Sequence, residues 1–246
     1  MSGNVGECQF THLPMASRWI GDICYKVNMS DINQLVIPIF TSPSRKIVSY
    51  NYSKNYPEES PHIMDIGAAV GYYSILVRHR FPEAEIHAID ALELHCNALT
   101  ETFALNGLSL DGVVVHKSAL ADRERTVLFL DQTYGSQILS AEQADLSCGQ
   151  ITPVHAHRLA TYIARAGGQV DLAKMDIQGS EAVVLESSNT VLREGHVRSW
   201  IVGTHSSDQH ERCLECLSPH YIIRFEDQKP SFQPDGIIVA VHKTVA

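Results

Sequence analysis

Long hydrophobic runs are missing from this sequence. No apolar stretch approaches the length of a membrane span, and the first residues have neither the basic start nor the apolar segment of a secretory signal. We therefore expect a cytoplasmic protein without a membrane partner. The six cysteines are spread over a chain that is not small, and without an export signal we expect their thiols to be reduced; they are Cys8, Cys24, Cys96, Cys148, Cys213 and Cys216.

Positive charge is also scarce. Only 19 lysines and arginines stand against 28 acids, so the formal net charge is -9. Because an acidic chain repels phosphate backbones, we expect no nucleic-acid partner. Apolar residues make up 44% of the 246 residues, which is enough for a buried core and argues against wholesale disorder.

Strand and helix patterns alternate from residue 62 onward, which predicts an α/β fold with a doubly wound, mostly parallel seven-stranded sheet. The last two strands have no helix between them, so they should form a hairpin with an antiparallel edge strand. Residues 1–60 lack this regular strand–helix alternation and are predicted to form an N-terminal cap on a main domain of residues 61–246. Expected strands cover residues 62–66, 85–90, 112–120, 125–131, 151–157, 170–177, 197–205, 221–226 and 236–243, and expected helices cover 70–80, 92–107, 158–168, 179–192 and 206–218.

The stretch "MDIGAAVGYYS" follows the first of these strands and lacks the usual phosphate-binding signatures. A dinucleotide fingerprint needs a glycine at position 69, which is alanine. A P-loop needs a lysine where Tyr72 stands. No lysine or arginine lies between Asp65 and Ile75 to neutralise a phosphate. The turn is therefore predicted to hold a ligand other than a pyrophosphate or a triphosphate.

Carboxylates at the strand ends favour S-adenosylmethionine (SAM) as that ligand. Asp65 suits the cationic methionyl end, directly or through water, and Asp90 can accept hydrogen bonds from both ribose hydroxyls. Gly67 and Gly71 would let the backbone approach the ligand closely. The turn residues Ala69 and Tyr72 are assigned to the same site. Adenine is expected to lie between Ala91 on one side and Ser118 and Ala119 on the other.

Together with "MDIGAAVGYYSIL", "IHAIDA" and "PDGIIVAV", the segment "KMDIQGSEAVVLESS" resembles the FkbM family of SAM-dependent methyltransferases. The family signature has the form K-[ILM]-D-[IV]-E-G-x-E. The resemblance covers about residues 60–241 and implies O-methylation of a hydroxyl on a small, sugar-like or natural-product acceptor of secondary metabolism. The chain departs from the pattern at Gln178, where glutamate is usual, and at Ala160, where an acid is common. Gln178 is assigned to the cofactor site.

Two other functions compete with this interpretation. One is a nicotinamide-dependent oxidoreductase, against which Ala69 argues. The other is a SAM-fold module that binds a partner and has lost catalysis, for which Gln178 is the sequence hint.

Asp176, Lys174 and His205 are the predicted catalytic residues. Asp176 ends a strand at the edge where the methyl group should lie, and it could orient the acceptor hydroxyl, contact the SAM amino group, or cap the following helix. Lys174 lies two residues earlier on the same strand face. His205 ends another strand, and its near-neutral pKa suits a general base, although it could equally satisfy the next helix.

No metal is predicted, although two sets of ligands were weighed. Asp176, Glu181, His205 and Asp208 could converge on a divalent ion if the fold brought them together. Cys213 and Cys216 have the spacing of half a zinc site, with the two neighbouring histidines at positions 205 and 210, but cysteines at such positions are more often part of the core.

The polar loop at residues 132–149 is expected to hang over the acceptor. Tyr134, Ser136 and Gln137 are its predicted substrate-binding residues. The N-terminal cap could close the acceptor site or form a homodimer contact, and the sequence leaves both roles open.

Overall fold

A computed structural model describes residues 35–36, 49–50, 60–131, 136–139, 150–229 and 236–244. The predicted cap and its homodimer contact lie largely outside these residues. Within the first 59 residues the described part consists of two short strands, β1 (Leu35–Val36) and β2 (Ser49–Tyr50), which pair antiparallel. The cap and the domain boundary at residue 61 therefore stay predictions.

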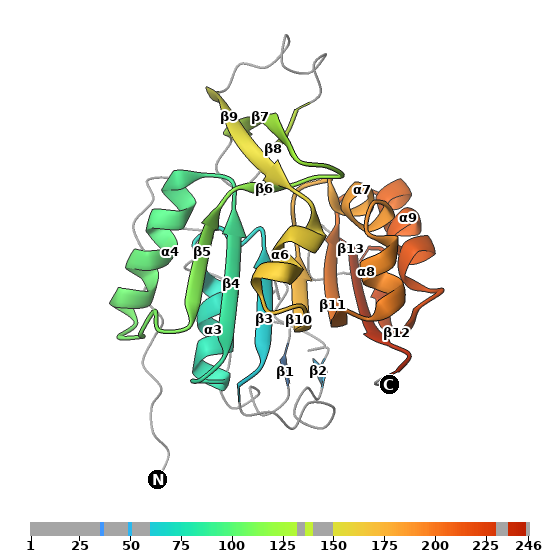
Figure 1. The fold of residues 1–246 in the computed structure, drawn as a ribbon, viewed down its shortest axis with the longest axis horizontal. Helices are drawn as coiled ribbons and strands as arrows, with labels where there is room; N and C mark the ends of the chain where they lie inside the picture. The colour runs from blue at the N-terminus through green and yellow to red at the C-terminus, as the bar shows by residue number, and fades with distance from the viewer. Residues whose placement is uncertain are drawn as a thin grey trace.

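A seven-stranded sheet forms the centre of the molecule, as predicted (Figure 1). Its strand order is β12-β13-β11-β10-β3-β4-β5. The chain runs outward from β3 to β5 and then returns to β10 on the other side of β3, so the switch point lies between β3 and β10. Ligands of such sheets bind beyond the carboxyl ends of the strands at that point. The strands are β3 (His62–Ile66), β4 (Glu85–Asp90), β5 (Val113–Lys117), β10 (Val170–Met175), β11 (Val197–Thr204), β12 (Tyr221–Asp227) and β13 (Gly236–His242).

The C-terminal hairpin supplies the antiparallel pairing that the sequence predicts at the sheet edge. The reversed strand is β13, which pairs antiparallel with both β11 and β12, while β12 is the outermost strand. All seven residues of β13 are buried, which agrees with its place inside the sheet.

Helices cover both faces of the sheet. On one face α3 (Tyr72–Arg80) and α4 (Glu93–Leu105) pack Ile75, Leu99 and Phe103 over the strands. On the other face the core includes Tyr162, Leu185 and Leu217. These three residues belong to α6, α7 and α9. The helices on this face are α6 (Leu159–Arg165), α7 (Glu181–Glu186), α8 (Asn189–Glu194) and α9 (Ser207–Leu217). No helix in the described ranges is long and apolar enough to cross a membrane.

The single helix predicted for residues 179–192 is wrong: two short helices, α7 and α8, replace it. The hydroxyls of Ser187 and Ser188 both donate to the carbonyl oxygen of Val184, at 2.9 and 2.6 Å. Serine side chains that bond to the preceding turn compete with the helical backbone and end the helix at this point.

A second, four-stranded sheet was not predicted. It has the order β6-β9-β7-β8 and lies above the carboxyl edge of the main sheet (Figure 1). The strand expected over residues 112–120 breaks at Ser118, whose N–H donates to the Asp90 carbonyl oxygen, and the chain then enters this sheet. Part of the predicted loop at residues 132–149 also forms a strand. The small sheet consists of β6 (Ala119–Leu120), β7 (Arg125–Asp131), β8 (Gln137–Ile138) and β9 (Gln150–His157).

Candidate active site

The glycine turn after β3 is held by the neighbouring strand. The N–H groups of Gly67 and Ala68 both donate to the carbonyl oxygen of Ile89, at 2.9 and 3.0 Å. Three residues of the turn have positive φ, namely Gly67 (+75°), Ala69 (+47°) and Gly71 (+82°). The turn therefore has one fixed shape, and its apex is a residue that rarely adopts this conformation.

The sequence predicts that Gly67 and Gly71 allow the backbone to approach the ligand. In the structure, both positions require glycine because other protein atoms lie too close for a side chain. A Cβ on Gly67 would lie 1.9 Å from the Asp176 carbonyl oxygen, and one on Gly71 would lie 2.5 Å from Cγ of Leu99. The glycines thus allow the protein to pack closely against itself. In particular, the Gly67 position brings the glycine turn against the strand end that carries Asp176.

We expect Gly67→Ala to destabilise the fold by about 2–5 kcal/mol, because the left-handed backbone costs about 1–2 kcal/mol and the overlap with Asp176 adds about 1–3 kcal/mol. Urea denaturation measures the change. Gly107→Ala is the matched control, since φ is +65° there and nothing lies within 4 Å of the added Cβ. Equal losses of stability in the two variants would show that the contact with Asp176 is not the reason why position 67 requires glycine.

Asp90 ends β4 and is bound by the turn beside it. Its Oδ2 accepts from the N–H of Ala69 at 2.9 Å, while Oδ1 accepts from the N–H of Leu92 and lies 3.0 Å from Nδ1 of His95. A carboxylate oxygen can accept two hydrogen bonds, so Oδ2 keeps capacity for a ligand hydroxyl. His95 was not predicted for this site, because its position five residues after Asp90 is a weak sequence signal.

The three residues predicted to surround adenine lie together at the junction of the two sheets. Ala91 and Ala119 belong to one buried apolar cluster, and Ser118 is buried beside it. The hydroxyl of Ser118 is hydrogen-bonded to the hydroxyl of Tyr162, so the serine is tied to the core. The apolar alanines fit an aromatic base, and the carboxylate of Asp90 fits ribose hydroxyls. The residues present therefore suit the SAM that the sequence predicts.

Lys174 and Asp65 form a buried ion pair beneath the turn, with Nζ of Lys174 3.3 Å from Oδ1 of Asp65. Lys174 also donates to the carbonyl oxygens of Gly67 (2.6 Å) and Ile66 (3.4 Å). Ser74 donates to Oδ2 of Asp65 at 2.7 Å, and Asp65 has no exposed surface. This geometry favours positioning roles for both residues over the catalytic role predicted for Lys174 and the direct ligand contact predicted for Asp65. Sequence analysis did not single out Ser74.

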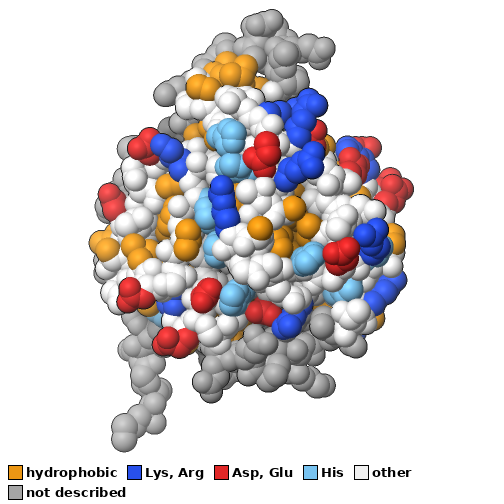
Figure 2. Space-filling view, viewed as in Figure 1, with side chains coloured by type: hydrophobic (Ala, Val, Ile, Leu, Met, Phe, Trp, Pro, Cys, Tyr) orange, Lys and Arg blue, Asp and Glu red, His pale blue; other side chains and the backbone are white. Residues whose placement is uncertain are grey.

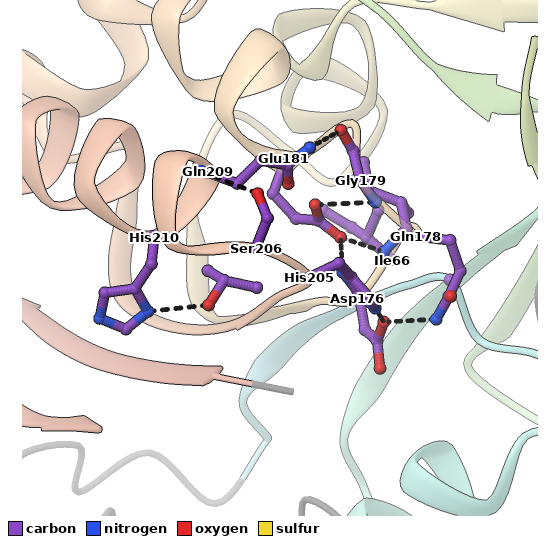
Figure 3. Close-up of polar contacts among 12 residues, drawn as sticks. Ile66, Asp176, Gln178, Gly179, Glu181, His205, Ser206, Gln209 and His210 are labelled. Carbon is purple, nitrogen blue, oxygen red and sulfur yellow. Dashed lines mark hydrogen bonds and ion pairs between the residues drawn. The ribbon is translucent and has the colours of Figure 1, made fainter. Parts of the chain in front are cut away.

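Asp176, His205 and Glu181 form a compact charged group at the carboxyl ends of β10 and β11. Figure 3 shows His205 between the two carboxylates: Nε2 lies 3.2 Å from Oδ1 of Asp176, and Nδ1 lies 3.2 Å from Oε1 of Glu181. Glu181 also accepts from the N–H groups of Ile177 (2.7 Å) and Gly179 (3.1 Å), which holds it at the start of α7. The sequence suggests Glu181 only as a metal ligand, although the family signature contains this glutamate.

The paired carboxylates determine the protonation of this group. Burial lowers the pKa of His205, but the hydrogen bonds and charges of Asp176 and Glu181 outweigh burial and raise it to about 10. Burial has the opposite effect on a carboxyl group and raises the pKa of Asp176. The His205 hydrogen bond and the Lys174 charge nevertheless bring this pKa below its ordinary value. At neutral pH His205 is an imidazolium and Asp176 is ionised. An imidazolium is a poor general base, so this arrangement disfavours the general-base role predicted for His205.

We expect the stabilising contribution of His205 to depend on pH. Because the folded-state pKa is raised from 6.5 to about 10, the contribution is fully present below pH 6.5 and is lost as the pH rises through 10. Its size is on the order of 5 kcal/mol. The measurement is the difference in unfolding free energy between wild type and His205→Gln from pH 6 to pH 10, with His220→Gln as the control. A difference that stays constant with pH would contradict the assignment.

Gln178 contacts the same group. Its φ is +53°, and its side-chain amide donates to Oδ1 of Asp176 at 3.3 Å. A glutamate here would place a third carboxylate beside Asp176 and Glu181, whereas the amide donates a hydrogen bond to the carboxylate. The contact explains how this chain accommodates its departure from the family signature.

The residues weighed as metal ligands converge only in part. Donor atoms of Asp176, Glu181 and His205 lie within 4.8 Å of one another, and His205 is ion-paired with both carboxylates. Asp208 is 76% exposed and pairs with Arg212. Nδ1 and Nε2 of His210 lie near Thr204 and Glu226, at 2.8 and 3.1 Å. Cys213 is buried in the core, as expected of a structural cysteine.

The remaining predicted residues are only partly described. Tyr134 lies outside the described residues. Ser136 is buried, and Gln137 is half-buried on β8, where it pairs with Leu130 of β7 above the carboxyl edge. Tyr72 is half-buried at the start of α3. The contacts that these residues would make with a ligand stay predictions.

Comparisons with solved structures place the fold. The FkbM methyltransferase of Methylobacillus flagellatus is 14% identical, has a TM-score of 0.54, and shares 74% of this chain but 44% of its own length. A TrmK from M. capricolum, solved with S-adenosylhomocysteine, is 12% identical over 80% of this chain and 69% of its own (TM-score 0.43). A precorrin-6y C5,15-methyltransferase from Geobacter metallireducens is 12% identical over 82% and 94% (TM-score 0.44). No curated protein sequence matches the chain.

The strand order, the glycine turn and Asp90 define a class I, Rossmann-like methyltransferase. Residues 65–234 match the family described as the methyltransferase FkbM domain. The match spans more than half of the chain, so the chain belongs to the FkbM methyltransferase family. Its cofactor is SAM, as the sequence predicts. This membership favours the methyltransferase over the nicotinamide-dependent alternative.

Proposed function

We propose that this methyltransferase transfers the methyl group of SAM to a hydroxyl oxygen of a small, sugar-like or natural-product acceptor. The observation that carries the proposal is Asp176, an ionised carboxylate at the switch point of the sheet. His205 and Gln178 both contact its Oδ1, and in Figure 3 the other oxygen points away from these two partners. An oxygen in that position can accept the proton of an acceptor hydroxyl.

Residues on three sides hold Asp176 in place. Its N–H donates to the carbonyl oxygen of Ile66 at 3.0 Å, and its carbonyl oxygen lies against Gly67. His205 pairs with its carboxylate and is itself held by Glu181. Alignment of the reacting groups supplies a large share of the barrier reduction in a displacement reaction, so a fixed carboxylate is the appropriate device.

The proposed mechanism gives each residue a separate task. Bound SAM supplies a methyl group on a sulfonium, which is already a good leaving group. Asp176 orients the acceptor hydroxyl and takes its proton as the oxygen–carbon bond forms. His205 and Glu181 act as positioning residues, and the ion pair of Lys174 and Asp65 fixes the glycine turn that would hold SAM.

Charge supports a neutral or cationic acceptor over a polyanion. The imidazolium of His205 compensates only one of the two carboxylates of Asp176 and Glu181, which leaves the group with a net negative charge. The chain as a whole carries -9. A phosphate-rich acceptor would be repelled both by this negatively charged group and by the net charge of the chain. The absence of a nucleic-acid partner is therefore part of this proposal.

The test is release of S-adenosylhomocysteine by the full chain with a panel of monosaccharides, polyols and phenols. Each compound is paired with a counterpart whose hydroxyls are already methylated, and RNA oligonucleotides and amines form a second arm. We expect turnover only with free hydroxyls, and a product heavier by one methyl group. Turnover with RNA or amines would overturn the acceptor class. Tight binding of S-adenosylhomocysteine without any turnover would favour the non-catalytic module instead.

A further inference from the structure

Histidine side chains gather in a line on the face of the molecule that carries α6, beginning at the small sheet (Figure 2). The rings of His155 and His157 are 4.4 Å apart between centroids, and His157 packs edge-on against Tyr162 at 5.6 Å. Tyr162 in turn meets the ring of His116 at 5.2 Å, and His116 stacks on His87. The line therefore has an inner and an outer pair of histidines, which differ in their partners.

The inner pair is satisfied within the protein. Nδ1 of His87 lies 3.0 Å from Nε2 of His116, so one ring donates a hydrogen bond to the other. The outer pair instead faces a carboxylate, that of Glu124 in the turn before β7.

The local structure brings these three side chains together. His155 and His157 alternate with Ala156 along β9, so both project from the same face of the strand. Oε2 of Glu124 is ion-paired with Nδ1 of His157 and lies 3.8 Å from Nε2 of His155. One donor atom from each residue lies within 4.8 Å of the other two.

The second oxygen of Glu124 is held by the protein. Oε1 accepts from the N–H of Arg158 at 3.1 Å and from the hydroxyl of Thr161 at 2.7 Å. These contacts orient the carboxylate so that its other oxygen points to the histidines. Hydrogen bonds that orient a ligand in this way are a regular part of protein metal sites.

We propose that Glu124, His155 and His157 bind a divalent transition-metal ion of the zinc class. Two imidazole nitrogens with one carboxylate oxygen suit Zn²⁺ and its neighbours, whereas Mg²⁺ and Ca²⁺ prefer sites made of oxygen alone. The side chains of His155 and Glu124 are 55% and 45% exposed, so an ion can enter and solvent can complete its coordination. The site is separate from the group around Asp176.

A metal ion bound here would link two segments of the small sheet, the turn before β7 and the end of β9. Glu124 precedes β7, and His157 is the last residue of β9, next to the chain segment that enters α6. Since β6 pairs with the end of β9 and follows directly on Ser118, the tie lies close to the residues predicted to surround adenine. The inferred role is to hold the turn before β7 against the end of β9.

The test is a calorimetric titration of the full, chelator-treated chain with Zn²⁺ alone. We expect one equivalent to bind, with at least a tenfold loss of affinity in His155→Ala and in Glu124→Gln. His220→Ala, which removes a histidine on the turn after α9, should bind as the wild type does. Zn²⁺ should also raise the melting temperature of the wild type but not that of His155→Ala. Mg²⁺ at the same concentration should produce neither effect.

Three results would overturn the proposal. They are no binding of Zn²⁺ to the wild type, binding of equal affinity in His155→Ala, and equally tight binding of Mg²⁺. Because Glu124→Gln keeps the shape of the side chain and His155 is exposed, loss of binding in both variants with intact folds identifies the ligands. None of these outcomes depends on methyl transfer.

Discussion

Replacing Asp176 with asparagine should reduce the rate of methyl transfer by roughly 10²–10⁴-fold, the range that a positioned general base contributes. The amide keeps the shape of the side chain but is a poor proton acceptor. Binding of S-adenosylhomocysteine should change only a few-fold, since the proposed role concerns the acceptor. Steady-state kinetics with an acceptor from the hydroxyl panel, together with calorimetry of cofactor binding, separates the two effects.

The matched control is Asp208→Asn, which makes the same exchange on an exposed residue of α9 that does not contact the group around Asp176. It should retain full activity. If Asp176→Asn kept the wild-type rate, the carboxylate would not take the proton. If the variant lost cofactor binding to the same degree as activity, Asp176 would belong to the cofactor site instead.

Replacing Asp90 with alanine should weaken S-adenosylhomocysteine binding about 10- to 100-fold. A hydrogen bond from a ribose hydroxyl to a charged acceptor contributes about 1.5–3 kcal/mol, and about 1.4 kcal/mol corresponds to tenfold in affinity. The variant also removes the acceptor of the N–H of Ala69 at the apex of the glycine turn. Calorimetric titration of the purified variant measures the change.

Glu93→Ala is the control for Asp90, because it removes an exposed carboxylate three residues away whose ion pair with Lys117 is also exposed. Its affinity for S-adenosylhomocysteine should equal that of the wild type. Asp90→Asn, which preserves the size of the side chain, checks that a folded protein also loses affinity. An unchanged affinity in both Asp90 variants would remove this residue from the cofactor site.

Much of the main sheet was predictable because its strands are local patterns separated by strong helix and turn signals. The apolar run before Asp65, the Pro82 stop after α3 and the Asn106-Gly107 end of α4 each lie within a few residues of the element that they define. The small sheet was not predictable in this way. Alternation marks residues 125–131 and 151–157 as strands, but their pairing, such as Arg125 with Ala156, joins distant parts of the chain.

The candidate site also contains some residues that local sequence patterns predict and others whose roles depend on contacts between distant parts of the chain. Asp90 and Asp176 were predictable because the carboxyl ends of parallel strands share one edge of the sheet. The charge state of His205 was not, because it depends on Glu181, which α7 brings from another part of the chain. The direction in which the Lys174 side chain points was also not predictable. Because β10 is buried on both faces, its sequence shows no alternation that would indicate that Nζ reaches the Gly67 carbonyl oxygen.

The most direct test of the central claim is the titration of the wild-type chain with S-adenosylhomocysteine, followed by the same titration with NAD. The glycine turn, Asp90 and the alanines beside it predict one bound S-adenosylhomocysteine per chain and no measurable binding of NAD. Binding of NAD, or no binding of S-adenosylhomocysteine, would contradict the account.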